Sequence, residues 1–348
     1  MLQVGIVGLG RWGQRLVNSV QEAGVPRGEL IRVVAGFTRS PDKARPFADS
    51  QDIRLVDSSF EELISTAAVD AVVIASPHSE HPNQVCAAAA ASRDVFVEKP
   101  LALDLDSAKA VADVCRRSDR VLAVGFNRRF LPAYLKIREQ IESGALGHLL
   151  HIEGNFSGPF GMSYTDDAWH ADRTQTPAGG LTLMGVHTLD CMIGLLGQVT
   201  NLTARSRRQH LEIDLDDTTD ICLDFEGGQT GYLSTLTATA SNWGLQVFGT
   251  DGWARMTDQA TVTVSRRGEN LESFHFTGSD PERAELEAFA TAVRNRSTPY
   301  PVPLEEVLNG IAAVSATRRS LDSRGSAESV ERYEPCQQET RPDQPTQP

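Results

Sequence analysis

The stretch VGIVGLGRWG, residues 4–13, contains three glycines in the spacing G-x-G-x-x-G. A short apolar run precedes them and a helical pattern follows to about residue 23, which is the strand–turn–helix context that a dinucleotide-binding turn requires. In such a turn Gly8 permits the tight bend, Gly10 lets the backbone approach a pyrophosphate, and Gly13 lets helix and strand pack closely. The alternative interpretation is a turn whose glycines serve packing alone. The residues expected to contact a cofactor here are Gly8, Gly10, Arg11, Trp12 and Gly13.

The first third of the chain repeats this alternation of short apolar runs and helical patterns. Continuous apolar strands that alternate with helices indicate a parallel sheet covered on both faces. Six such strands match a complete doubly wound Rossmann sheet, an α/β fold. The expected strands cover residues 4–7, 31–37, 53–56, 71–75, 94–97 and 121–126, and the expected helices cover residues 11–23, 41–49, 60–65, 81–91 and 106–118.

The pattern changes after residue 126, where strands and hairpin-turn signals dominate and a few helices remain. This pattern predicts a C-terminal α+β domain with an open, largely antiparallel sheet and helices on one face. We expect an NAD(P)-binding domain over residues 1–126, a substrate and oligomerisation domain over 127–330, and a disordered polar tail over 331–348. The expected helices cover residues 132–143, 181–196, 281–295 and 304–323, and the strands cover 149–156, 199–205, 219–225, 230–237, 244–249, 253–257 and 261–266.

Composition excludes several classes of protein. Thirty-three basic residues against forty-six acidic ones give a net charge of −13, which argues against a nucleic-acid partner. No run of about 18 apolar residues occurs, so no membrane span is expected, and the start of the sequence lacks the basic region and cleavage site of a signal peptide. The five cysteines are far apart, so neither a metal site nor a disulfide framework is expected. We expect a cytoplasmic enzyme that acts on a small molecule.

The second expected strand ends at Phe37 and continues as Thr38-Arg39-Ser40. An acidic residue at this place would bind the 2′-hydroxyl group of the adenosine ribose and repel a 2′-phosphate. The sequence instead offers a guanidinium group and two hydroxyl groups, which suit a phosphate. We therefore expect NADP(H) to be favoured over NAD(H). The alternative is that Arg39 is a solvated surface residue and that the protein accepts both cofactors.

The fifth expected strand ends in VFVEKPLALD, residues 95–104. Ligands of open parallel sheets bind beyond the carboxyl ends of the strands, so Glu98 and Lys99 are expected beside a nicotinamide ring. Pro100 restricts the backbone of Lys99 to extended conformations and so fixes the direction of its side chain. A lysine that ends a buried strand predicts a functional group rather than a surface charge.

Several stretches together resemble the glucose–fructose oxidoreductase, inositol dehydrogenase and rhizopine-catabolism (Gfo/Idh/MocA) oxidoreductases over roughly residues 1–325. The resemblance implies a Rossmann domain, a second domain whose open sheet mediates homodimers or homotetramers, and hydride transfer between NAD(P) and a secondary alcohol or ketone of a sugar, polyol or cyclic diol. It also implies that Lys99 is catalytic and that its peptide bond to Pro100 is cis. The stretches that carry it are VGIVGLGRWG, IASPHSEH (74–81), VEKPLA (97–102), VGFNRRFLPAY (124–134) and GGLTLMGVHTLD (179–190).

The last of these stretches departs from the family pattern, which has an aspartate four residues before its histidine. Here the two positions are Leu183 and His187, on one face of the expected helix. We expect His187 to act as acid–base and Lys99 to stabilise the alkoxide, with the two roles open to reversal. Because Leu183 removes the carboxylate, the alternative is a cofactor-binding family member without dehydrogenase turnover, a sensor or a partner subunit.

Further positions in these stretches are candidates for contact. Asn127 and Arg128 follow the sixth strand, where the alternative role is an ion pair between domains. Asp190 lies three residues after His187 and could orient its imidazole or serve packing. The remaining expected cofactor contacts are Ser76, Pro77, His81, Glu98 and Lys99. The expected substrate contacts are Lys99, Asn127, Arg128, Trp169, His170, Leu183 and His187.

Overall fold

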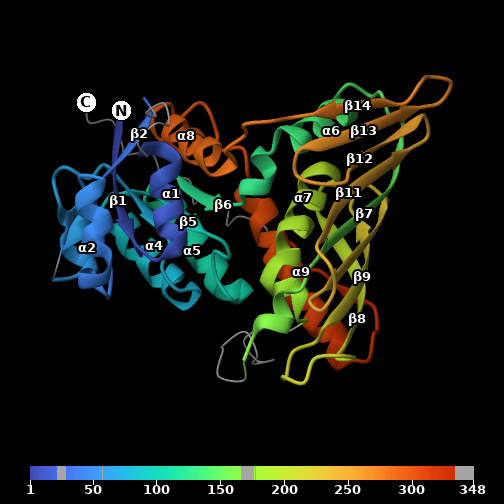
Figure 1. Ribbon diagram of the computed structural model, residues 1–348, viewed down its shortest axis with the longest axis horizontal. Helices are drawn as coiled ribbons and strands as arrows, with labels where there is room; N and C mark the ends of the chain where they lie inside the picture. Colours follow the sequence, from blue (N-terminus) through green and yellow to red (C-terminus); the bar gives the residue numbers. More distant parts are fainter. Residues whose placement is uncertain (22–28, 57, 166–175, 177, 334–348) are drawn as a thin grey trace, which may run out of the picture.

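The computed structural model describes residues 1–21, 29–56, 58–165, 176 and 178–333. Its first sheet has parallel strands in the order β3-β2-β1-β4-β5-β6, which is the order of a doubly wound dinucleotide fold and confirms the predicted class (Figure 1). The order reverses between β1 and β4, so ligands are expected at the carboxyl ends of these strands. The strands are β1 (Leu2–Val7), β2 (Ile31–Phe37), β3 (Arg54–Leu55), β4 (Ala71–Ile74), β5 (Asp94–Glu98) and β6 (Leu122–Gly125).

Helices flank this sheet, and one of them comes from the far end of the chain. Helix α8 (Pro281–Arg294) packs against α1, β5 and β6, although the sequence assigned it to the second domain (Figure 1). Its N-cap is Asp280, whose side chain accepts a hydrogen bond from the backbone N–H of Arg283. The other helices of this part are α1 (Arg11–Gln21), α2 (Pro41–Ser50), α3 (Phe60–Ser65), η1 (His78–Glu80), α4 (His81–Ala90) and α5 (Leu105–Arg117).

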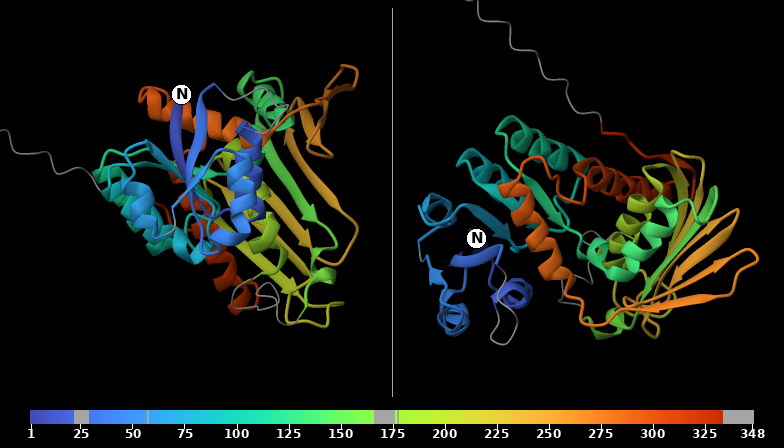
Figure 2. Two further views of the ribbon diagram at one scale, coloured as in Figure 1. Left: turned by 60° about the vertical axis from the view of Figure 1, so that its left-hand side comes forward. Right: turned by 90° about the horizontal axis from the view of Figure 1, so that it is seen from above.

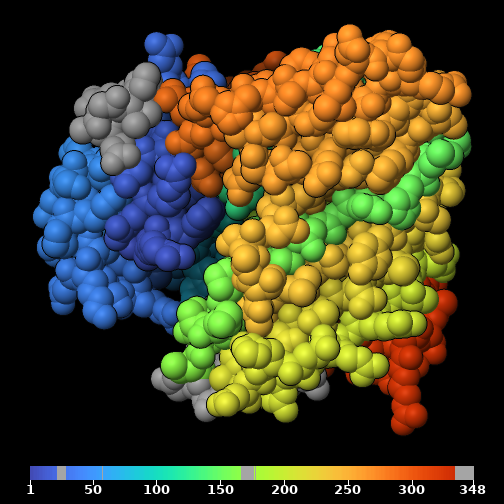
Figure 3. Space-filling model, turned by 45° about the vertical axis from the view of Figure 1, so that its right-hand side comes forward, coloured from blue at the N-terminus to red at the C-terminus, as the bar shows by residue number. Residues whose placement is uncertain are grey.

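The second sheet has nine strands within the described residues, in the order β14-β13-β12-β11-β7-β10-β9-β8-β15. Side chains of its strands alternate between buried and exposed, which leaves one face open to solvent (Figure 3). The strands are β7 (Leu149–Ser157), β8 (Val199–Arg207), β9 (Thr218–Phe225), β10 (Thr230–Leu236), β11 (Asn242–Gly249), β12 (Gly252–Met256), β13 (Thr261–Arg266), β14 (Glu272–His275) and β15 (Glu328–Ser329).

The pairing in this sheet is mixed, because β7 and β10 run parallel whereas the other strand pairs are antiparallel. The chain leaves β7 through a long connection that contains α7 and returns at β8. The meander β8–β9–β10 then brings β10 beside β7 in the same direction. The short strands β14 and β15 at the two edges were not predicted from the sequence.

Helices cover the inner face of the second sheet and separate it from the first sheet (Figure 2). They are η2 (Asn127–Phe130), α6 (Pro132–Glu142), η3 (Phe160–Ser163), η5 (Leu181–Gly185), α7 (Val186–Leu196) and α9 (Leu304–Asp322). The expected helix 181–196 begins as the π-helical turn η5 and continues as α7. A Cβ atom on Gly185 would lie 2.6 Å from Thr235 Cγ2 of β10, so the glycine lets this turn press against the sheet. No helix in the described part of the chain combines the length and apolar composition that crossing a bilayer requires.

The first three residues of the expected disordered tail, 331–333, lie within the described residues and contact α5. Glu331 forms an ion pair with Lys109 of α5, and the hydroxyl group of Tyr333 donates a hydrogen bond to Asp113 at 3.0 Å. These contacts hold residues 331–333 on the first part of the molecule and correct the prediction for them. Residues 334–348 lie outside the described residues.

A buried ion-pair group joins three helical segments behind the junction of the two sheets. Arg129 of η2 donates to both carboxylate oxygens of Asp190 of α7 at 2.7 and 2.8 Å, and to Glu306 of α9 at 2.6 Å. Arg129 and Asp190 are both buried. A Cβ atom on Gly194 would lie 1.7 Å from the Arg129 guanidinium group, so the glycine makes room for it. Arg129 is therefore structural, and Asp190 serves it rather than the imidazole of His187.

Replacing Asp190 by alanine is expected to lower the free energy of unfolding by about 3–5 kcal/mol, because it leaves the Arg129 charge buried with only Glu306 as partner. Urea denaturation measures this change. The matched control is Glu142→Ala, which breaks an exposed i,i+4 pair with Arg138 and is expected to cost under about 1 kcal/mol. A loss below about 1 kcal/mol for Asp190→Ala would contradict the structural role.

Candidate active site

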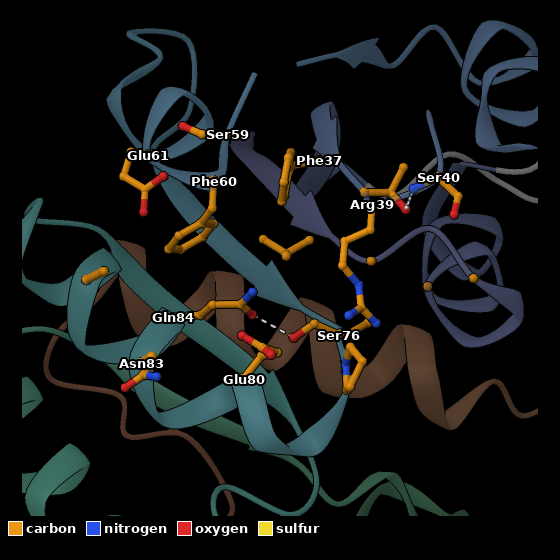
Figure 4. Close-up of a pocket in the computed structure, with 18 of the residues that line it drawn as sticks. Phe37, Arg39, Ser40, Ser59, Phe60, Glu61, Ser76, Glu80, Asn83 and Gln84 are labelled. Atoms are coloured by element: carbon orange, nitrogen blue, oxygen red, sulfur yellow. Dashed lines mark hydrogen bonds between the residues drawn. The ribbon is translucent and has the colours of Figure 1, made fainter. Parts of the chain in front are cut away.

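A cavity of about 730 Å³ lies at the carboxyl ends of β1, β2 and β4 (Figure 4). The predicted cofactor residues that line it are Gly8, Gly10, Trp12, Gly13, Thr38, Arg39, Ser40, Ser76 and Pro77. The sequence did not single out Ser59, Phe60, Glu61, Asn83 or Gln84, which also line it. These side chains come from α4 and from α3 with its N-cap Ser59, and no motif marks them, because their approach depends on how the helices pack. Arg11 is exposed at the start of α1 and is not among the lining residues.

The three glycines of the opening motif have different local environments. Gly8 has φ of +90°, and a Cβ atom there would lie 2.5 Å from the carbonyl oxygen of Ala75 on the next loop. A Cβ atom on Gly13 would lie 1.9 Å from the carbonyl oxygen of Gly8, so this glycine closes the turn onto the helix. A Cβ atom on Gly10 would meet no atom within 4 Å. The open space beside Gly10 is a cradle that fits a pyrophosphate at the N-terminus of α1.

His81 does not lie among the lining residues of this cavity. Its ring is fully buried, with Nδ1 2.8 Å from the carbonyl oxygen of Pro100 and Nε2 2.9 Å from that of Ser76. Burial lowers the pKa of His81, and the two backbone contacts oppose this shift. The residue joins the loop after β4 to the loop after β5. We therefore correct its expected role from cofactor contact to support of these two loops.

Lys99 directly follows β5, and its peptide bond to Pro100 is cis, as the family resemblance implied. Burial and repulsion by Arg128 lower the pKa of Lys99, while the neighbouring Glu98 opposes the shift. A small cavity of about 70 Å³ is lined together by Lys99, Phe126, Thr182 of η5 and Val186, the first residue of α7. The end of β5 therefore faces the start of α7.

His187 lies in the first turn of α7 and is 6% exposed. Its ring packs between Phe126 and Phe156, with ring centroids 6.1 and 6.5 Å away, and its Nδ1 atom is buried without a hydrogen-bond partner in the described part of the chain. Burial lowers the pKa of His187 well below its usual range, and repulsion by Lys99 and Arg128 lowers it further. The structure thus brings Lys99, Arg128 and His187 into one electrostatic neighbourhood.

The other predicted substrate contacts have different outcomes. Leu183 is half-buried in the π-helical turn that precedes His187. Asn127 is buried and engaged at both ends, because its Nδ2 donates to Glu282 at 2.8 Å and its Oδ1 accepts from Arg128 at 2.7 Å. Asn127 therefore supports Arg128 and is not free to contact a substrate. Trp169 and His170 lie outside the described residues.

Family models match most of the chain. The oxidoreductase family with an NAD-binding Rossmann fold matches residues 2–126, and the GFO/IDH/MocA C-terminal domain matches residues 134–255. The chain belongs to the GFO/IDH/MocA oxidoreductases.

Within the described residues no group of three or more His, Cys, Asp or Glu side chains is arranged to hold a metal ion.

The similarity to individual relatives extends over most of this chain and most of each relative. The uncharacterized oxidoreductase YrbE of Bacillus subtilis is 30% identical, with 75% of each chain covered. The scyllo-inositol 2-dehydrogenase (NAD(+)) of the same organism is 26% identical over 91% of this chain and 94% of its own. The structure of an NAD-binding oxidoreductase from Klebsiella pneumoniae has the same fold, with a TM-score of 0.86, 23% identity, and 95% and 99% of the two chains covered.

The glycine environments predict opposite outcomes for two similar substitutions. Gly10→Ala is expected to fold with unchanged stability and to lose coenzyme affinity, because its methyl group enters the open cradle. Gly13→Ala is expected to lower stability by several kcal/mol, because its methyl group overlaps the Gly8 carbonyl oxygen. Thermal unfolding and coenzyme titration on both variants measure the difference. Equal coenzyme affinity of Gly10→Ala and the wild type would show that the pyrophosphate binds elsewhere.

Proposed function

We propose that the protein transfers a hydride between a nicotinamide coenzyme held at the Gly8–Gly13 turn and a secondary alcohol or ketone of a sugar, polyol or cyclic diol. The observation that carries the proposal is geometric: the cavity at the glycine turn lies at the carboxyl ends of β1, β2 and β4, and Lys99 at the end of β5 lines a second cavity with the residues just before His187. Lys99, Arg128 and a neutral His187 act on one another there, and such a group of side chains suits an oxygen that becomes negatively charged. The inositol dehydrogenases among the relatives support the substrate class.

The side chains of this site divide the proton chemistry. The nicotinamide ring, when bound, supplies or accepts the hydride. The lowered pKa of Lys99 favours it as the group that takes the hydroxyl proton in oxidation and returns it in reduction. His187, held neutral by burial, donates or accepts one hydrogen bond and orients the substrate oxygen. The electrostatics therefore favour the reverse of the first assignment, with Lys99 as acid–base and His187 as the orienting group.

Leu183 stands where the family pattern has an aspartate four residues before its histidine. A half-buried leucine beside His187 cannot accept hydrogen bonds from substrate hydroxyl groups. We propose that the substrate presents fewer hydroxyl groups on this side than an inositol does. Turnover of a panel of polyols, cyclic diols and their ketones, with Leu183→Asp beside the wild type, tests this. A protein that binds coenzyme but turns over no member of the panel would support the non-catalytic alternative.

Residues 1–126 would serve as the coenzyme-binding unit, completed by α8, and residues 127–330 as the substrate and assembly unit. The open outer face of the second sheet supports assembly into homodimers or homotetramers (Figure 3). Sedimentation of the purified protein, with charged substitutions on the outward positions of β10, tests this assembly.

Lys99→Met is expected to lower kcat/KM by about 10²–10⁴-fold, because the acid–base group is lost while the side-chain length is kept. Lys109→Met is the matched control, since Lys109 pairs with Glu331 on the surface of α5. Steady-state kinetics with the substrate identified in the panel measure both. Equal activity of Lys99→Met and the wild type would exclude the proposed role of Lys99.

The lowered pKa of Lys99 also predicts a pH dependence. Alcohol oxidation needs the neutral amine, so kcat/KM for oxidation is expected to rise with pH through a midpoint below 10.5, the ordinary lysine value. Ketone reduction needs the ammonium form and is expected to fall through the same midpoint. Profiles of kcat/KM against pH measure both directions. A midpoint that is unchanged in Lys99→Arg would assign the titration to another group.

We propose NADP(H) as the preferred coenzyme. Arg39 extends into the cavity from the end of β2, with Thr38 and Ser40 beside it (Figure 4). Arg39→Ala is expected to reduce kcat/KM for NADP by about 10–100-fold, the value of a charge-assisted hydrogen bond of about 1.5–3 kcal/mol, and to leave NAD nearly unchanged. Kinetics with both coenzymes measure the ratio. Equal losses for the two coenzymes would contradict a 2′-phosphate site at Arg39.

A further inference from the structure

Two carboxyl groups are buried at the junction of β5, β6 and α8, next to Lys99. Glu285 of α8 is 0% exposed, and neither of its carboxyl oxygens has a hydrogen-bond partner in the described part of the chain. Glu98 is the last residue of β5, and its buried Oε1 atom also lacks a partner among those residues. It lies against Gly125 of β6, where a Cβ atom would be 3.1 Å from Glu98 Oε1. Buried carboxyl oxygens without hydrogen-bond partners are rare and call for an explanation.

A neighbouring glutamate on the same helix shows that this environment is specific to the pair. Glu282, one turn before Glu285, receives a hydrogen bond from Asn127 at 2.8 Å and pairs with Arg15 at 2.8 Å. These partners lower the pKa of Glu282 against the opposing effect of burial. Helix α8 therefore carries one ionised, partnered glutamate and one buried, unpartnered glutamate within a single turn.

Burial and mutual repulsion favour a proton on Glu98 and Glu285. Burial raises the pKa of Glu98 to about 7, while Trp12 and Lys99 act in the opposite direction. Burial raises the pKa of Glu285 well above its usual range, and repulsion by Glu98 and Glu282 adds to it. Two acids that repel each other lose their protons in two separate steps, and only the first step falls near neutral pH. The charged or titratable groups that act on this pair are Lys99, Arg128, Asp280, Glu282 and Tyr300.

We propose that Glu98 and Glu285 form a carboxyl pair that carries one proton more with the reduced coenzyme than with the oxidised coenzyme, and so balances the charge of the nicotinamide ring. The oxidised ring brings a positive charge to a place that already holds Lys99 and Arg128. Loss of one proton from the pair to solvent supplies the compensating negative charge. The reduced ring is neutral, and the pair then keeps its proton. This inference rests on the proposed coenzyme site.

The link from the pair to the coenzyme runs through two neighbouring side chains. Trp12 lines the large cavity and acts on the carboxyl group of Glu98. Lys99 is adjacent in sequence and acts on the same carboxyl group. Both acids are buried, so their charge is shielded from water and acts strongly on the site. Neither acid lines the large cavity or the small cavity at Lys99, so both are positioning residues rather than catalytic ones.

The test compares affinities for oxidised and reduced coenzyme from about pH 5.5 to about pH 8.5, on either side of the pKa of about 7 for Glu98. Calorimetric titration of the full chain with NADP⁺ and with NADPH, each in two buffers of different ionisation enthalpy, gives both the Kd and the number of protons released. The ratio of the NADPH Kd to the NADP⁺ Kd is expected to rise with pH, by up to about tenfold per pH unit below the pKa of the pair. About one proton is expected to leave for each NADP⁺ bound there, and almost none for each NADPH.

Variants separate this pair from other titrating groups. Glu285→Gln is expected to keep the rise near the same pH, and Glu98→Gln to move it to higher pH, because the remaining acid is more deeply buried. The double variant Glu98→Gln/Glu285→Gln is expected to have a ratio that does not change with pH. Glu287→Gln on the same helix is the matched control, since Glu287 pairs with Arg283 at the surface, and it is expected to behave as the wild type.

Three results would overturn the proposal. A pH-independent ratio in the wild type, or no proton release with NADP⁺, overturns it without any variant and leaves the coenzyme site intact. An unchanged pH dependence in a folded double variant assigns the proton to another group, such as Lys99, and overturns it as well. Absence of any coenzyme binding refutes the proposed function itself, and the inference with it.

Discussion

The charge on Lys99 is disfavoured where the fold places it. Burial and the nearby Arg128 lower its pKa, and the same two cationic groups help to keep His187 neutral. An oxygen atom with developing negative charge is stabilised at this site, because it relieves the repulsion between the Lys99 and Arg128 cations. The remainder of the structure can be understood as what holds these side chains together against that repulsion.

Two sets of contacts hold Lys99, Arg128 and His187 close together. The parallel sheet places Lys99 at the end of β5, and the buried His81 joins the loop after β5 to the loop after β4. On the other side, the Arg129–Asp190 pair ties η2 to α7, which fixes the distance between Arg128 and His187. Gly185 and Gly194 allow α7 to come close enough to its neighbours for this. The coenzyme cradle and the candidate catalytic groups therefore depend on one rigid junction.

Much of this could be predicted from the sequence, because it depends on local patterns. The glycine turn and the position of Lys99 follow from short motifs whose meaning is set by backbone geometry, and the doubly wound sheet follows from the alternation of apolar strands and helices. The missing parts depend on contacts between distant residues. Asn127 meets Glu282, which is 155 positions away, and nothing in the short η2 segment indicates that partner. The burial of Glu285 is equally hidden, since an amphipathic helix with several acids does not show which of them faces the core.

The π-helical turn at Leu181–Gly185 and the parallel pairing of β7 with β10 were missed for the same reason. Both arise from packing between elements, whereas the residue pattern of each element alone is compatible with a regular helix or an antiparallel strand. The corrected roles of His81 and Asn127 share this origin, because each side chain is used by backbone or side-chain partners that only the folded chain provides.

The most direct measurement is a crystal structure of the protein with its nicotinamide coenzyme bound. We expect the pyrophosphate beside Gly10 and the nicotinamide ring between the amino group of Lys99 and the imidazole of His187. A ring bound away from both side chains, or a coenzyme that avoids the Gly8–Gly13 turn, would contradict this expectation.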